Sequence, residues 1–117
     1  MTICNLEYLK NVTPGSNDFP IQIIELFIKN LPNQILKTKI ALENANCEDI
    51  YNFTHKIKPS LTMLGFSFEI IETLLKINEF SKNCINLDQI PTLLYHLENE
   101  LDKAYIELQA ELIELKK

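Results

Sequence analysis

Glycine is scarce in this sequence, and its scarcity limits the folds that the chain can adopt. Only two of the 117 residues are glycine, Gly15 and Gly65, and the five prolines can all be placed at helix starts, kinks or turns. Tight β-hairpins depend heavily on glycine-containing turns. Hydrophobic residues make up 46% of the chain and charged residues 23%, which are ordinary proportions for a soluble protein. We therefore expect one all-α domain spanning residues 1–117.

Long apolar runs and an excess of basic charge are also lacking. No stretch reaches the roughly 18 apolar residues that cross a bilayer. The first residues do not have the basic-then-apolar order of a signal peptide. A net charge of -5 disfavours attraction to nucleic acid or to an anionic membrane surface. These features predict a cytoplasmic chain whose partners are proteins, without direct membrane contact.

The three cysteines, Cys4, Cys47 and Cys84, are far apart and include no CxxC pair. This pattern predicts neither a disulfide framework nor a zinc site, so we expect reduced thiols. The sequence has no glycine-rich phosphate loop and no Walker motif, which disfavours an enzyme that binds its own nucleotide. A carboxylate-bridged metal bundle would need a Glu-x-x-His pair, and the sequence has none. We expect no metal and no cofactor of its own.

Apolar residues recur at intervals of three and four through most of the chain, which is typical of amphipathic helices. The pattern predicts one short and four long helices, at about residues 3–9, 19–43, 46–65, 67–83 and 86–117. None of the long helices can bury its apolar stripe alone, so they most simply form an antiparallel up-and-down four-helix bundle. The last helix could instead extend outward as a coiled-coil partner, although a long bundle helix explains its pattern equally well.

Particular residues mark the ends of these helices. The predicted N-caps are Asn17 or Asp18, Asn46, Ser67, and Asn86 with Gln89 as its capping partner. Gly65 is expected to end the third helix. Pro32 removes a backbone hydrogen bond from the second helix, which it must either bend or split. We expect a bend, because the apolar stripe continues through the proline.

His55 lies on the helix predicted at residues 46–65. A rotation of about 100° per residue places it roughly 140° away from the apolar stripe of that helix, so its side chain should face solvent. Four side chains lie within about 60° of it, one turn before or after: Tyr51, Lys58, Pro59 and Thr62. A neutral imidazole can act as a nucleophile, and Lys58 can neutralise an incoming phosphoryl group.

A histidine followed by a lysine is nevertheless common on protein surfaces, and alone it would be an ordinary surface feature. His96 lies off the apolar stripe of the last helix and is interpreted in that way. The longer string Thr54-His55-Lys56-Ile57-Lys58-Pro59-Ser60, closing at Leu64-Gly65, is more informative. It resembles the signature of histidine-phosphotransfer domains of bacterial multistep phosphorelays, and the order of helices resembles that family over nearly the whole chain.

The resemblance implies that the chain is a phosphocarrier, not an enzyme. His55 would be the phosphorylated residue, Lys58 would stabilise the phosphoryl group, and Ser60 would occupy a small position beside the site. The implied partners are response-regulator receiver domains, a hybrid sensor histidine kinase or both. A receiver domain would supply the Mg²⁺ and the acidic pocket.

Two positions depart from the family pattern. Most members have glycine after the lysine, where this chain has Pro59, which cannot donate a hydrogen bond to the carbonyl of His55. We therefore expect a local bend at His55. Many members also supply a polar residue, often glutamine, from the next helix. Here Lys76 or Asn78 would have to take that role.

Two alternatives remain open at the level of sequence. A bundle of this kind could have lost the relay and act only as a protein-docking module. The chain could also be either a free-standing protein or the terminal domain of a hybrid kinase. In each case we expect a monomer. The predicted docking surface around His55 comprises Tyr51, Pro59, Ser60 and Thr62, with Phe66 as a further candidate.

Overall fold

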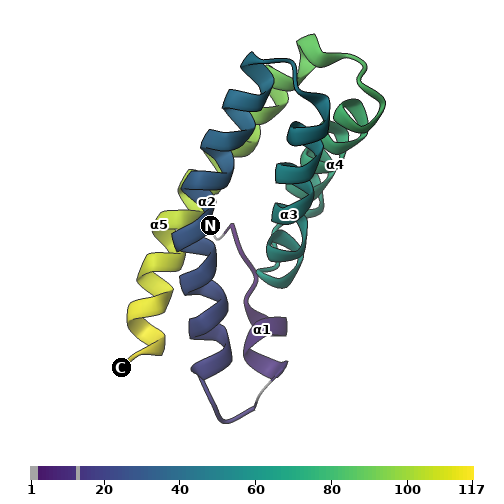
Figure 1. Cartoon of the computed structure of the whole chain (residues 1–117). Coiled ribbons are helices and arrows are strands. Elements are labelled where there is room, and N and C mark those ends of the chain that lie inside the picture. The colour runs from purple at the N-terminus through teal and green to yellow at the C-terminus, as the bar shows by residue number, and fades with distance from the viewer. Residues whose placement is uncertain (1–2, 13) are drawn as a thin grey trace.

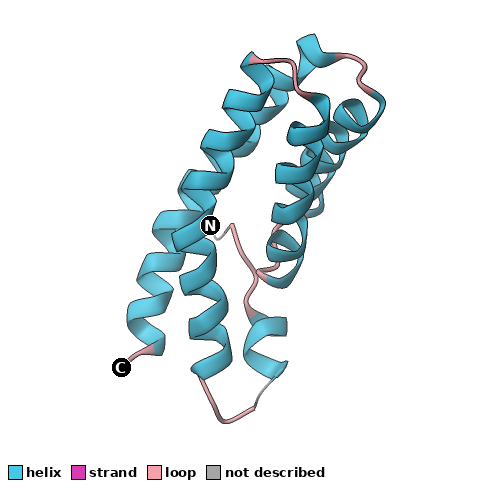
Figure 2. Ribbon diagram, viewed as in Figure 1, coloured by secondary structure: helices cyan, strands magenta, loops and turns pink. Residues whose placement is uncertain are grey.

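The computed structural model of the protein describes residues 3–12 and 14–117. In these ranges the chain consists of helices joined by loops and turns (Figure 2). Its helices in chain order are α1 (Glu7–Val12), α2 (Asp18–Glu43), α3 (Cys47–Met63), α4 (Phe68–Asn83), the short 3₁₀ helix η1 (Leu87–Gln89) and α5 (Ile90–Leu115). The predicted all-α fold is therefore confirmed.

The four long helices form the predicted antiparallel bundle. Each of them contacts the next one along the chain, and α2 contacts α5, which closes the bundle. Helices α2 and α5 have 26 residues each, whereas α3 has 17 and α4 has 16. The longer pair therefore extends beyond the shorter one, and α1 lies below α3 beside this extension (Figure 1). The molecule measures 46 by 23 by 23 Å.

The core consists of the apolar stripes of the four long helices, together with Leu9 of α1 and three residues from connecting segments, Cys4, Leu64 and Phe66. Its largest fully buried side chains are Leu9, Ile24, Ile50, Ile57, Leu61, Leu64, Leu74, Ile77, Ile90, Leu97, Leu101 and Leu108. Complete burial of such a side chain contributes about 2 kcal/mol of transfer free energy. Among the described residues, no helix is both long enough and apolar enough to cross a membrane.

Two of the predicted N-caps form as expected. The side chain of Asn46 accepts a hydrogen bond from the N–H of Asp49 (3.1 Å), and that of Ser67 accepts one from the N–H of Ile70 (3.4 Å). Helix α2 is continuous from Asp18 to Glu43, so Pro32 does not split it.

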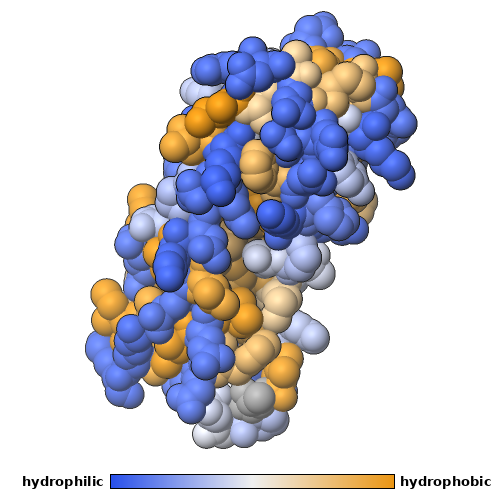
Figure 3. Space-filling view, viewed as in Figure 1, coloured by the Kyte–Doolittle hydropathy of each residue, from blue (hydrophilic) through white to orange (hydrophobic). Residues whose placement is uncertain are grey.

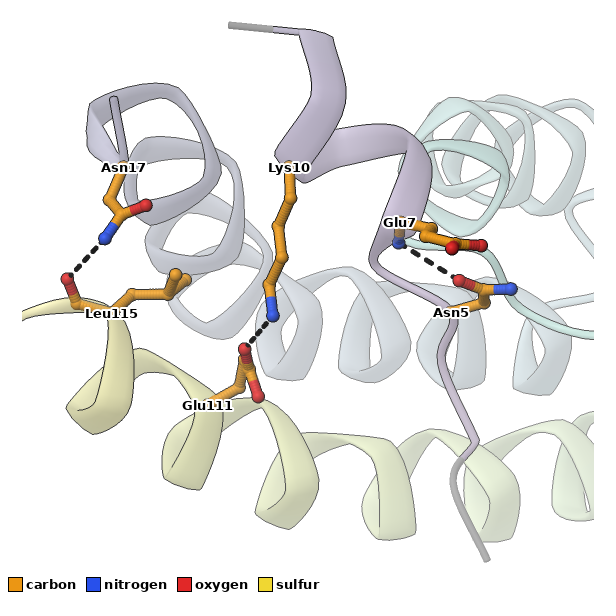
Figure 4. A network of polar contacts seen from close by, with 6 residues as sticks. All are labelled: Asn5, Glu7, Lys10, Asn17, Glu111 and Leu115. Carbon is orange, nitrogen blue, oxygen red and sulfur yellow. Dashed lines mark hydrogen bonds and ion pairs between the residues drawn. The ribbon is translucent and has the colours of Figure 1, made fainter. Parts of the chain in front are cut away.

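The residues predicted to cap the other two long helices occupy N-cap positions, Asn17 before α2 and Asn86 before η1, but neither side chain makes a capping bond. The side chain of Asn17 makes no capping bond and instead donates to the carbonyl of Leu115, at the C-terminal end of α5 (3.2 Å; Figure 4). Asn86 has a left-handed backbone and no side-chain capping bond, and the 3₁₀ helix η1 intervenes before α5 begins at Ile90. Tertiary contact and a turn of 3₁₀ helix thus replace the local caps.

Gly65 ends α3 as predicted, and the structure shows why glycine is needed there. Its φ is +69°, and the N–H groups of Gly65 and Phe66 donate to the carbonyls of Thr62 and Leu61. This is the hydrogen-bond pattern of a Schellman helix end. A Cβ atom at Gly65 would also overlap the carbonyl of Asn5, whose N–H donates to the carbonyl of Gly65 (3.0 Å).

The N-terminal segment differs from the prediction of a helix at residues 3–9. Residues 3–6 are not helical, and α1 begins at Glu7, whose N–H donates to the Asn5 side chain (3.0 Å; Figure 4). The N–H groups of Ile3 and Cys4 donate to the carboxylate of Glu107 on α5, at 2.7 and 3.1 Å. An ion pair between Lys10 and Glu111 adds a second link to α5 (Figure 4). These contacts tie the segment across the end of the shorter helix pair.

Cys4 is a buried free thiol within this segment. Burial, and secondarily the negative charge of Glu107, raise the pKa of the Cys4 thiol to about 12. The thiol is therefore protonated at neutral pH and behaves as a small apolar side chain.

The expectation of three reduced thiols is wrong for the other two cysteines. Cys47 and Cys84 form a disulfide, and their Cα atoms are 5.5 Å apart. The two residues meet because α3 and α4 are antiparallel, so that the start of α3 lies beside the end of α4. A separation of 37 residues gives no local sign of this pairing.

Candidate functional site

Helix α3 presents His55 to solvent, as predicted. Its buried side is formed by Ile50, Thr54, Ile57 and Leu61, and His55 is exposed. Phe53 lies on the side of α3 that faces α2, because the ammonium of Lys37 on α2 is 5.8 Å from the centre of the Phe53 ring. His55 follows Phe53 by two residues, a rotation of about 200°. Its side chain therefore points away from α2.

Tyr51 is the nearest aromatic neighbour of His55. The two rings are stacked, with their centroids 5.4 Å apart and an interplanar angle of 20°. Tyr51 precedes His55 by one helical turn, as the spacing predicted. The half-buried phenol ring covers one face of the imidazole, which limits the rotations open to it.

On the other side of His55, α3 forms a shallow surface hollow. It is lined by His55, Lys58, Pro59, Thr62 and Met63, and we call it the His55 hollow. Three of the predicted neighbours, Lys58, Pro59 and Thr62, are therefore brought together with the histidine. Met63 was not predicted. Met63 lies one helical turn after Pro59, and this spacing could have predicted its place beside the hollow.

Two other residues predicted for the docking surface lie elsewhere. Ser60 does not line the His55 hollow; it is half-buried and about 140° around the helix from His55. Phe66 is buried in the core, with its ring centre 5.9 Å from that of Phe27. The proposal of Phe66 as an exposed docking residue is therefore wrong, because the turn at Gly65 directs it inward.

Lys58 is the cation of the His55 hollow. Among the residues that the structure describes, it makes no ion pair with a carboxylate, so its charge is not compensated within the chain. The neighbouring Lys56 points to the other side of α3, with its ammonium 5.9 Å from the ring centre of Phe53. Lys58 therefore lines the hollow, whereas the ammonium of Lys56 lies near the Phe53 ring.

A buried polar contact lies behind His55. The hydroxyl of Thr54 lies 2.5 Å from the side-chain oxygen of Asn78 on α4 and 2.8 Å from the carbonyl of Ile50. Asn78 is buried, so it does not reach into the His55 hollow, and its suggested role beside the imidazole is wrong. Lys76 is about 160° around α4 from Asn78, so it points away from α3. Neither residue lines the His55 hollow.

Pro59 lies inside α3, and the helix continues through it to Met63. Proline has no N–H, so the carbonyl of His55 lacks its normal donor four residues later. This leaves an acceptor on the exposed side of the helix, next to the imidazole. The bend expected at His55 remains a prediction.

No group of three or more His, Cys, Asp or Glu side chains in the described ranges is arranged to hold a metal ion. His96, the other histidine, is exposed on α5, as expected. No protein-family model matches the chain, and no curated protein or solved structure matches it. A functional interpretation therefore depends on the chemistry of the side chains around His55.

Proposed function

We propose that the protein is a phosphocarrier that accepts a phosphoryl group on His55 and passes it on. The observation that carries this proposal is an exposed imidazole in one hollow of α3 with Lys58, whose ammonium makes no ion pair with another described residue. The resemblance of the surrounding sequence to histidine-phosphotransfer domains gives the proposal its direction. In this proposal the chain is a carrier and not an enzyme.

The side chains around His55 suit a phosphoryl acceptor. A neutral imidazole nitrogen is the nucleophile, and the stacked Tyr51 ring holds the imidazole in a narrow range of orientations. Lys58, one turn later, would lie beside the bound phosphoryl group and offset its negative charge. A pre-oriented nucleophile with a nearby cation lowers the cost of reaching the transition state.

The transfer step itself is an exchange between two phosphoryl acceptors. An imidazole nitrogen of His55 attacks the phosphorus of an aspartyl phosphate on a receiver domain. A P–N bond forms, the acyl P–O bond breaks, and the aspartate leaves as a carboxylate. The reverse step passes the group to another receiver. Mg²⁺ and the acidic pocket belong to the receiver in this scheme, so the carrier needs no cofactor.

The partners that fit this proposal are response-regulator receiver domains, alone or joined to a hybrid sensor histidine kinase. Tyr51, Pro59, Thr62 and Met63 would form the contact area around His55, while Ser60 lies outside it. We place the exchange in the cytoplasm. The Cys47–Cys84 disulfide would then have to persist where glutathione keeps most thiols reduced.

Transfer from a phosphorylated receiver tests the proposal. The labelled receiver is mixed with the wild-type chain, with His55→Gln and with the matched control His96→Gln, and label on the chain is followed over time. We expect label on the wild type and on His96→Gln but not on His55→Gln. Label on His55→Gln would contradict the proposal. Receiver binding without transfer would favour a docking module.

A further inference from the structure

A groove runs between α2 and α5, on the side of the bundle away from α3 and α4. It has a volume of about 320 Å³ and is lined by Leu31, Pro32, Ile35, Leu36, Lys39, Glu98, Leu101, Asp102 and Tyr105. We call it the α2–α5 groove. None of its lining residues belongs to α3, and His55 points away from α2. The groove therefore belongs to a different face from the His55 hollow.

Exposed apolar side chains surround the α2–α5 groove. Leu36 in its wall is 55% exposed, and Ile106, one turn after Asp102, is 70% exposed. Ile40, Tyr95 and Ile113 continue this surface along the same two helices, each with about half or more of its side chain in contact with solvent. Figure 3 shows apolar side chains along the α2 and α5 side, at the left of the view. Several large exposed apolar side chains gathered beside a groove are typical of an interaction site.

We propose that a second copy of this chain covers the α2–α5 groove and that the protein forms a two-fold symmetric dimer. The inference goes beyond the phosphocarrier function and does not depend on it. A monomer was the expectation from sequence. The groove and its apolar border are the reasons to propose a dimer instead.

The charges at the groove favour a second copy as the occupant. Lys39 lies in the α2 wall and Asp102 in the α5 wall. A two-fold axis parallel to the helices lays the α2 wall of each copy against the α5 wall of the other, because such an interface is self-complementary. Lys39 of one copy then faces Asp102 of the second, twice in the dimer. Within the chain, Lys39 pairs with Glu98, whereas Asp102 makes no ion pair with another described residue.

The size of the face is adequate for a stable pair. A standard interface covers roughly 800 Å² on each partner. The chain exposes 7091 Å² in total, and one side of the bundle measures 46 by 23 Å. The same arrangement leaves both copies of the His55 hollow open to other proteins.

Sedimentation equilibrium on the full chain tests the proposal, from micromolar to millimolar concentration and with non-reducing gels to exclude covalent dimers. We expect the wild type to dimerise, and Leu36→Glu and Ile106→Glu each to weaken the dimer at least about tenfold. Phe68→Glu is the matched control, because Phe68 is 75% exposed but lies on α4; it should dimerise like the wild type. A wild type that is monomeric at every concentration would overturn the proposal. The proposal would also be overturned if Phe68→Glu lost the dimer while Leu36→Glu and Ile106→Glu kept it.

A mixing experiment tests the two-fold pairing itself. In Asp102→Lys the symmetric contact becomes two lysines, and in Lys39→Glu it becomes two carboxylates, so each variant alone should be mainly monomeric. Mixing the two restores opposite charges at both contacts, and a heterodimer should form. Circular dichroism confirms that both variants are folded. If mixing yields no heterodimer, or if both single variants still dimerise like the wild type, the proposed arrangement is wrong.

Discussion

At the scale of single residues, the site depends on how α3 distributes its two lysines. Lys58 lies in the His55 hollow, whereas Lys56 is directed to Phe53 on the opposite side. Both are exposed and they are only two positions apart in sequence. The helical rotation alone therefore separates a lysine beside the imidazole from a lysine that covers an aromatic ring.

This difference makes a prediction about transfer rates. Lys58→Gln removes the positive charge beside the bound phosphoryl group, and we expect phosphoryl transfer to His55 to slow by about tenfold. Lys56→Gln is the matched control and should transfer at the wild-type rate. Rapid-quench measurement of label on the chain compares them. Equal rates for the two variants would show that Lys58 does not assist phosphoryl transfer to His55.

Gly65 is a second residue whose identity the structure explains. We expect Gly65→Ala to lower the free energy of unfolding by about 3 kcal/mol, since the new Cβ meets the Asn5 carbonyl and the backbone is left-handed. Gly15→Ala has the same backbone problem, at φ +84°, but open space around it. It should cost only about 1 kcal/mol. Urea denaturation measures both, and equal losses would show that the Asn5 contact is unimportant.

At the scale of helices, the Thr54–Asn78 contact fixes α3 against α4 behind His55. We expect Thr54→Val to destabilise the protein by about 2 kcal/mol, because Asn78 then loses a buried partner. Asn78→Leu should cost less, since the Thr54 hydroxyl keeps the carbonyl of Ile50. The double variant should be close to Asn78→Leu. Chemical denaturation of the three variants checks this order, and a more costly Asn78→Leu would contradict it.

The Cys47–Cys84 disulfide joins the same two helices about two turns away, at the start of α3 and the end of α4. Closing a loop with this separation of 37 residues stabilises a fold by about 4 kcal/mol. Reduction should therefore lower the unfolding midpoint of the wild type and leave that of Cys84→Ser unchanged. Cys4→Ala serves as the control and should respond to reductant like the wild type. A wild type with the same midpoint in both redox states would show that the bond adds no stability.

The sequence predicted the ends of helices correctly where contacts between residues close in sequence determine those ends. Asn46, Ser67 and Gly65 mark helix ends by bonds within a few residues, so their positions could be read directly. The start of α1 could not be predicted, because the N–H groups of Ile3 and Cys4 bind Glu107, about a hundred residues away, and that of Asn5 binds the carbonyl of Gly65. The disulfide and the inward position of Asn78 depend likewise on how α3 and α4 pack.

In the candidate site, too, the neighbours on one helix could be predicted and a residue beyond that helix could not. Tyr51, Lys58, Pro59 and Thr62 share one helix with His55, so the helical repeat alone predicted that they would be neighbours. Phe66 lies beyond the end of that helix, where the turn at Gly65 sets its direction. The repeat of α3 does not extend to it.

At the scale of the whole molecule, the bundle has two faces with different character. The face with His55 combines a nucleophile and a cation in a shallow hollow, whereas the α2–α5 groove is bordered by large apolar side chains. A phosphocarrier must remain open at its histidine while it meets successive receivers. Placing a self-association surface on the other side of the bundle would satisfy that requirement.

The position of the phosphoryl group tests the central claim most directly. The chain is incubated with a phosphorylated receiver, quenched in alkali because phosphohistidine is labile in acid, and digested for mass spectrometry. We predict one phosphoryl group, on the peptide that contains His55, and its loss after brief treatment with acid. A phosphoryl group on His96 or on a hydroxyl side chain, or none on the chain while the receiver stays phosphorylated, would contradict it.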